Sequence, residues 1–197
     1  RMVTAMVASG ASAALITGFP AVINAAFPGA PVAAVINAVI LTRAPVLVPL
    51  QRFQSALVVR FVEHRDRIYT ALAMPIGAVL GLGAVGFVAA WAVGPLILRV
   101  AFSPEYAMGG VSLGVLTFAS AFMGALMITG VAVLALERHG WYVAGWLTAT
   151  AVAFGILFAA PVGAEGGGTV ASISIALFAG PLAGALVHVA GLRRALR

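Results

Sequence analysis

The sequence predicts an all-α integral membrane protein, with about six transmembrane helices packed into one bundle. Hydrophobic residues make up 63% of the 197 residues, charged residues make up 8%, and the mean hydropathy is +1.14. A soluble domain carries about 25% charged residues, because its surface must be solvated by water. Residues 71–98 contain no charge, and a hydrocarbon core about 30 Å thick needs only about 20 apolar helical residues to cross it. The lipid bilayer is therefore the first expected partner.

Six spans are expected within a single transmembrane domain, over about 3–27, 31–60, 69–98, 108–136, 141–161 and 167–191. The first two share the uncharged stretch 2–42, and a cluster of prolines and glycine at 28–31 predicts a turn between them. The second span is unusual because Arg43 and Arg52 lie inside it. Each of the other four coincides with an uncharged run of the sequence.

The distribution of charge predicts the orientation of these spans. The net charge of +6 comes entirely from arginine, and the most basic connection is 60–67. Because cytoplasmic loops of membrane proteins are enriched in basic residues, this loop is expected inside, together with 137–139 and the basic tail. Both termini of the segment are then cytoplasmic, in a multi-pass membrane protein. Helix-end arginines explain the basic balance better than nucleic acid does, so no nucleic-acid partner is expected.

Small residues four apart suggest how the helices pack. The pairs Gly77/Gly81, Gly110/Gly114 and Gly180/Gly184 match the GxxxG spacing, which lets two membrane helices approach closely. The chain has no cysteine, and its five carboxylates lie in or beside the expected loops. No metal site, cofactor or catalytic acid–base pair is therefore expected, and the protein is not expected to be an enzyme.

The sharpest candidate for function is Arg43. It lies about 12 residues, or roughly 18 Å, into its span, where a charge costs at least ~2.5 kcal/mol unless it faces a cavity or a partner. Pro45 and Pro49 follow closely and free backbone carbonyls. One interpretation is an aqueous cavity with an anion-binding arginine, which Arg52 could line as well. The alternative is that Arg43 pairs with backbone while Arg52 extends to the cytoplasmic headgroups.

His188 is the titratable residue of the last span. It could relay protons across the membrane. Its place near the cytoplasmic end favours a hydrogen bond to a neighbouring helix instead.

Three stretches of the chain, residues 95–106, 135–140 and 43–67, resemble the bacterial polysaccharide flippases, which are oligosaccharide-lipid exporters of the MOP (MATE-like) superfamily in the plasma membrane. Residues 95–106 (PLILRVAFSPEY) are similar to that family's L-x-x-L-F-G-x-x-Y helix end, with Ser103 where the family usually has glycine. Residues 135–140 (ALERHG) look like its A-L-G-R cytoplasmic turn, and 43–67 resemble its matching long helix. The resemblance covers most of residues 30–160.

The resemblance implies a MATE-type bundle that forms the C-terminal half of a longer transporter. Two such bundles would alternate access to a cationic cavity, which takes the diphosphate and sugars of a lipid-linked oligosaccharide. The implied partners are that substrate and a missing N-terminal bundle of the same protein. Arg43 is the first residue expected in the cavity, followed by Gln51, Arg52 and Gln54. Two alternatives stay open: a MATE-like drug/cation antiporter, which needs an intramembrane carboxylate, and a non-transporting membrane scaffold.

Overall fold

The computed structural model describes residues 2–28, 32–160 and 167–195, and the regular structure within them is helical. The helices are α1 (Met2–Ile16), α2 (Phe19–Ala26), α3 (Ala33–Glu63), α4 (Ile68–Ala101), α5 (Gly110–Ala135), α6 (His139–Ala159) and α7 (Gly167–Ala195), with short 3-10 turns η1 (Arg65–Arg67) and η2 (Pro104–Tyr106). Five helices are long and apolar enough to cross a membrane, and the bent pair α1–α2 brings the total to as many as six. The predicted all-helical class is therefore confirmed for the described residues, and the helices are compatible with a membrane bundle.

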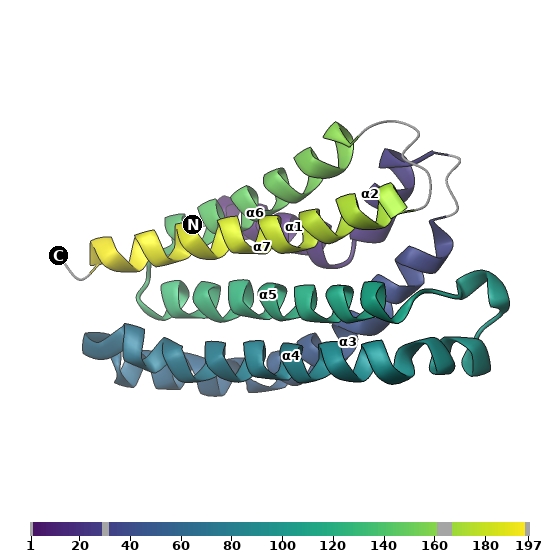
Figure 1. Ribbon diagram of the computed structural model, residues 1–197. Coiled ribbons are helices and arrows are strands. Elements are labelled where there is room, and N and C mark those ends of the chain that lie inside the picture. The colour runs from purple at the N-terminus through teal and green to yellow at the C-terminus, as the bar shows by residue number, and fades with distance from the viewer. Residues whose placement is uncertain (1, 29–31, 161–166, 196–197) are drawn as a thin grey trace.

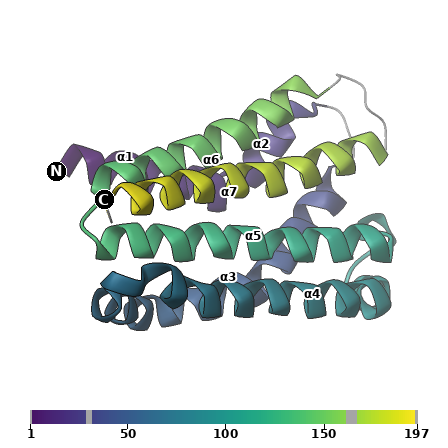
Figure 2. The same cartoon turned by 60° about the vertical axis from the view of Figure 1, so that its left-hand side comes forward.

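Helix α5 forms the centre of the bundle. It packs against α3 and α4 on one side and against α7 on the other, and α6 and then α1 lie beyond α7 (Figures 1 and 2). The side chains of α5 are the most deeply buried of any long helix, whereas those of α4 are mostly exposed. This arrangement explains why both helices are equally apolar in sequence: α5 faces protein, and α4 faces its surroundings.

The connections that were predicted to be cytoplasmic gather at one end of the bundle. In Figure 1 the start of α4, the turn from α5 to α6 and the end of α7 all lie at the left. Helix α1 also begins on this side in both views. The turn η2 lies at the opposite end. Two other loops predicted for that end, at 28–31 and 162–168, fall mainly on residues 29–31 and 161–166, which lie outside the described residues.

Two of the three predicted glycine pairs form close helix contacts. A Cβ on Gly114 would lie 3.0 Å from the Phe87 backbone oxygen of α4, and Gly110 is in similarly close contact with α4. On α7, a Cβ on Gly180 or Gly184 would lie 2.7 Å or 2.6 Å from a carbonyl oxygen of α6. Glycine is therefore needed for these approaches. Gly77 and Gly81 have no such neighbour among the described residues.

The structure corrects the prediction of one continuous helix over 3–27. The chain breaks after Ile16, and the axes of α1 and α2 differ by 62°. Thr17 and Gly18 both donate their N–H groups to the Ala13 carbonyl, at 2.8 Å and 3.0 Å, which closes α1. Pro20 then begins α2 without an N–H group of its own. The first interruption of the helical structure is thus at Pro20, and not at the loop predicted for 28–31.

Helix α3 runs without a break from Ala33 to Glu63, although Pro45 and Pro49 lie inside it. Each proline removes one backbone hydrogen bond, but packing against α5 holds the helix on both sides of them. The helix starts beside α2 and crosses the bundle obliquely to reach α4 (Figure 2). This oblique path brings the middle of α3 past the break between α1 and α2.

Candidate functional site

Arg43 bridges α3 to the broken end of α1. Its side chain is 6% exposed. Nη1 donates hydrogen bonds to the carbonyl oxygens of Leu15 at 3.2 Å and Ile16 at 2.9 Å. These are the last two residues of α1, so the guanidinium caps the helix in place of the next turn.

The break itself makes these carbonyls available. In an uninterrupted helix the Ile16 oxygen would accept a bond from the N–H of residue 20, but residue 20 is proline. An unpaired carbonyl in a bilayer interior costs several kcal/mol, because water is absent there. The carboxyl end of a helix also carries a partial negative charge. A buried cation at this end therefore satisfies both the hydrogen-bonding and the electrostatic demand.

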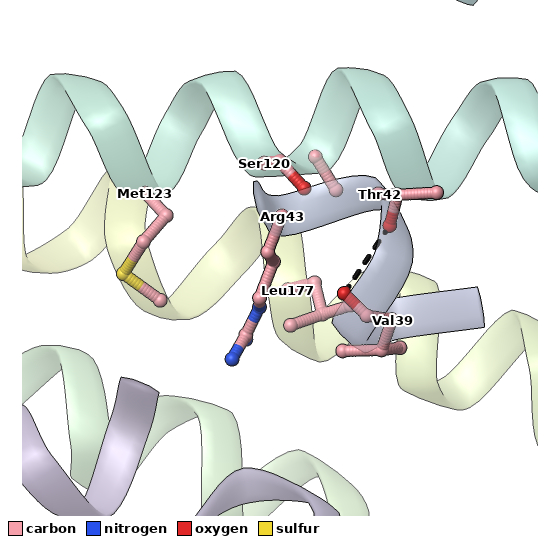
Figure 3. Close-up of a pocket in the computed structure, with 7 residues that line it drawn as sticks. Val39, Thr42, Arg43, Ser120, Met123 and Leu177 are labelled. Carbon is pink, nitrogen blue, oxygen red and sulfur yellow. Dashed lines mark hydrogen bonds between the residues drawn. The ribbon is translucent and has the colours of Figure 1, made fainter. Parts of the chain in front are cut away.

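One nitrogen of Arg43 has no partner. Nη2 is buried and makes no hydrogen bond within the described residues, and no carboxylate there pairs with the guanidinium. Cζ lies 5.0 Å from the ring centroid of Phe19, the first residue of α2, at a distance where a cation is attracted by an aromatic face. The guanidinium points away from α5 (Figure 3). Around the arginine the space has no room for a water molecule; it is lined by Val39, Thr42, Arg43, Ala119, Ser120, Met123 and Leu177.

A larger cavity of about 350 Å³ lies between α1, α3, α5 and α6. We call it the glutamine cavity; it is lined by Ser12, Ile16, Leu50, Gln51, Gln54, Leu57, Met127, Val131, Tyr142 and Trp146. Gln51 and Gln54 supply amide donors and acceptors from α3, and Ser12 and Tyr142 face them from α1 and α6. The cavity is thus polar on part of its wall and apolar on the rest, as ligand sites usually are.

The structure brings three of the four predicted site residues close to one another. Gln51 and Gln54 line the glutamine cavity, and Arg43 adjoins it through Ile16, whose carbonyl binds the arginine and whose side chain lines the cavity. Arg52 is exposed and lines neither space. Arg43 pairs with backbone carbonyls, as the alternative to an anion-binding cavity predicted. Its unpaired Nη2 could still donate a hydrogen bond to one more acceptor.

His188 occupies a second buried polar site, where α5, α6 and α7 meet. Its ring is fully buried and stacks on Tyr142 with centroids 6.0 Å apart. Nε2 donates to the Tyr142 carbonyl oxygen at 3.1 Å, and Nδ1 lies 3.1 Å from the Thr129 hydroxyl. With Nε2 protonated, Nδ1 of the neutral ring is an acceptor for the hydroxyl hydrogen, which it shares with the Leu126 carbonyl oxygen 3.0 Å from the same hydroxyl. Both nitrogens are therefore paired, in line with the hydrogen-bonding interpretation of this residue.

Several residues of the site were missed at the level of sequence. Phe19 and Ser12 belong to the first expected span and look like ordinary lipid-facing positions. The signal that could have found the joint is Gly18-Phe19-Pro20, because a glycine followed closely by a proline often ends one helix and starts another. Tyr142, near the start of α6, lines the glutamine cavity and stacks on His188.

Comparison with known proteins finds close mycobacterial relatives. The chain is 43% identical over 189 residues to the uncharacterized protein Rv1510 of Mycobacterium tuberculosis, which covers 95% of this chain and 42% of that protein. It is 41% identical over 191 residues to the uncharacterized proteins Rv3630 of M. tuberculosis and Mb3654 of M. bovis, covering 96% of this chain and 43% of each. No protein-family profile and no solved structure match. The chain is thus similar to mycobacterial proteins of which it spans less than half the length.

Proposed function

We propose that this chain forms one bundle of a flippase for lipid-linked oligosaccharides, of the MATE-like type, which moves a polyprenyl-diphosphate glycan by alternating access. The observation that carries the proposal is the unpaired Nη2 of Arg43, whose acceptor residue Ile16 also lines the glutamine cavity, while the carboxylates of the described residues are all exposed. An intramembrane cation with an unused donor suits an anionic substrate. Arginine also binds phosphate oxygens with paired hydrogen bonds.

The amides of the glutamine cavity suit the rest of the substrate headgroup. Gln51 and Gln54 lie toward the end of α3 that leads to the basic 60–67 connection. A substrate arriving from the cytoplasm would reach these amides before it reached Arg43. Amide groups both donate and accept hydrogen bonds, so they serve sugar hydroxyls and phosphate oxygens equally. Polyprenyl chains would stay in the bilayer.

The break between α1 and α2 supports an exchange of hydrogen bonds during transport. In the observed conformation Arg43 is held by the carbonyls of Leu15 and Ile16. Movement of α1 away from α3 would release the guanidinium, and substrate phosphate oxygens would take the place of the two carbonyls. The guanidinium would keep its hydrogen bonds in this exchange, and the carbonyls of Leu15 and Ile16 would then need other donors. The mycobacterial relatives are more than twice as long as the matched stretch, which leaves room in them for a second bundle.

The test is the leaflet distribution of lipid-linked oligosaccharide in cells that lack the full-length gene. Deletion is expected to accumulate the oligosaccharide on the cytoplasmic face, and the wild-type gene is expected to restore export. An Arg43→Ala gene should fail to restore it while Arg99→Ala succeeds, because Arg99 is exposed at the far end of α4. Equal amounts of each variant in the membrane must be shown by immunoblot.

Other outcomes separate the alternatives. A normal leaflet distribution after deletion would reject the flippase and redirect the search to drug efflux or to a scaffold role. Full export by Arg43→Ala would retain the flippase but remove Arg43 from its site. Within the described residues the carboxylates Glu63, Asp66, Glu105 and Glu137 are all exposed, so this bundle offers no buried acid for cation coupling, and the flippase remains the proposal.

A further inference from the structure

The opposite end of the bundle contains a second hollow that the glutamine cavity does not reach. It measures about 510 Å³ and lies where the start of α3 meets the end of α4 and the turn η2. We call it the Asn37 hollow; it is lined by Asn37, Val100, Ala101, Phe102, Ser103 and Tyr106. Five of these six residues belong to the 95–106 stretch, the motif that drew the resemblance but has no part in the site described above.

The polar groups of the hollow have no partners in the protein. The Asn37 amide nitrogen is shielded from solvent and makes no hydrogen bond. Within the described residues, the hydroxyls of Ser103 and Tyr106 also lack hydrogen-bond partners. A buried amide without a partner is unfavourable, and Asn37 is one of the residues that line the hollow. Three side chains from two parts of the chain thus converge with unused donors and acceptors.

The remaining wall is aromatic and apolar. The rings of Phe102 and Tyr106 lie 6.1 Å apart, inclined by 55°, and Val100 and Ala101 complete the surface. No charged side chain lines the hollow, since Glu105 points elsewhere on η2 and is exposed. A diphosphate would find no cation here. A ligand that fits must be neutral, rich in hydroxyl or amide groups, and able to place an apolar face on an aromatic ring.

We propose that the Asn37 hollow is a binding site for a sugar unit, and that it receives the glycan at the non-cytoplasmic end of the bundle. Sugar rings carry hydroxyls for Asn37, Ser103 and Tyr106, and C–H faces for the two aromatic rings. The hollow lies at the end of the bundle opposite the basic connections, where a flipped glycan would emerge. The identification of the sugar as part of a flipped glycan rests on the proposed function. The proposal that the hollow binds a sugar does not.

A single introduced thiol can test the site, because the chain has no cysteine. The full-length protein, with any cysteine elsewhere replaced by serine, is prepared in nanodiscs with Ala101→Cys, which leaves all three polar side chains intact. The rate of maleimide labelling is measured with and without oligosaccharide released by mild acid from the cells' own lipid-linked pool. At about ten times its dissociation constant, the sugar should slow labelling about tenfold.

Matched controls make the result specific. Val111→Cys places a thiol on an exposed position near the same end that does not line the hollow, and its labelling should not change. Adding Asn37→Ala to the Ala101→Cys protein should abolish protection, whereas Asn24→Ala, an exposed asparagine of α2, should not. Folding is checked by gel filtration, and loss of an unpaired amide is expected to leave it intact.

Three outcomes would overturn the site. The first is labelling that the released oligosaccharide does not slow, and the second is protection by polyprenyl diphosphate without its glycan. Protection that persists with Asn37→Ala would reject the assigned donor and with it the site as defined. The leaflet measurement stays separate: sugar protection combined with normal leaflet distribution after gene deletion would uphold the sugar site and reject the flippase.

Discussion

Two buried polar residues of this bundle, His188 and Arg43, differ in how completely their hydrogen-bonding groups are paired. His188 and Arg43 both lie within membrane-spanning helices and are almost entirely buried. Each ring nitrogen of His188 has a partner, on α6 and on α5. Arg43 binds two carbonyls through Nη1 and leaves Nη2 without a partner. The hydrogen-bonding groups of the His188 ring are therefore all paired, whereas Arg43 retains an unpaired N–H donor group.

The surroundings of the two sites differ in the same sense. Gly130 and Gly145 make room for the His188 ring, and a Cβ on Gly130 would lie 3.3 Å from its Cε1 atom. Helices α5, α6 and α7 are thereby locked together. Arg43 instead joins α3 to a helix end that bends by 62° and adjoins the glutamine cavity. The comparison suggests a rigid half around His188 and a movable joint at Arg43, which substitutions can test.

The largest loss of stability is expected from Gly145→Ala. Its Cβ would overlap the His188 ring, with Cε1 at 2.8 Å, and overpacking of this kind costs about 3 kcal/mol. The measurement is thermal unfolding of the purified protein in detergent. Gly155→Ala is the matched control on the same helix, because nothing lies within 4 Å of its Cβ. Equal unfolding temperatures for the two variants would show that the α6–α7 contact is not rigid.

Arg43→Met is expected to lower the free energy of unfolding by about 2 kcal/mol, since it leaves two carbonyls in the bilayer without donors. Pro20→Ala supplies the missing N–H for the Ile16 oxygen. In the Arg43→Met background it should therefore recover about 1 kcal/mol. A double-mutant cycle of unfolding measures this coupling. Strictly additive effects would contradict the assignment of Arg43 as the cap of α1.

Thr129→Val should cost about 1 kcal/mol, because it removes the hydroxyl that contacts both His188 Nδ1 and the Leu126 carbonyl oxygen. Thr129→Ser keeps the hydroxyl and should stay close to the wild type. Unfolding in detergent gives both values. A loss from Thr129→Ser as large as that from Thr129→Val would assign the effect to the lost methyl group and not to the hydrogen bond.

The smallest effect is expected at the turn between α5 and α6, and it is a gain. Glu137 has φ of 60°, a left-handed conformation that costs a non-glycine residue about 1 kcal/mol. The bonds from Glu137 N to Leu134 O and from Arg138 N to Val133 O close the helix in the way that favours glycine at this position. Glu137→Gly should therefore stabilise the protein by about 1 kcal/mol. Glu137→Ala, which keeps the strain, should not; a comparable gain from Glu137→Ala would point to the lost charge.

The sequence by itself determined that the chain is helical and apolar enough to span a membrane, because uncharged runs longer than about 20 residues have few other stable forms. It also singled out Arg43, Gln51 and Gln54, since polar groups stand out in such runs. The glycine pairs on α5 and α7 were likewise readable, because small residues four apart share one helix face.

Tertiary structure alone decided what those residues touch. Arg43 meets the carbonyls of residues 15 and 16, which precede it by 28 and 27 positions, and periodicity along one helix carries no information on a contact between two. The same holds for His188, whose partners come from α5 and α6. Gln51, Arg52 and Gln54 are all exposed on α3, but only the two glutamines line the cavity, because the position of α3 against α1, α5 and α6 decides which side of the helix borders it. Packing between helices, and not their composition, therefore defines the candidate site.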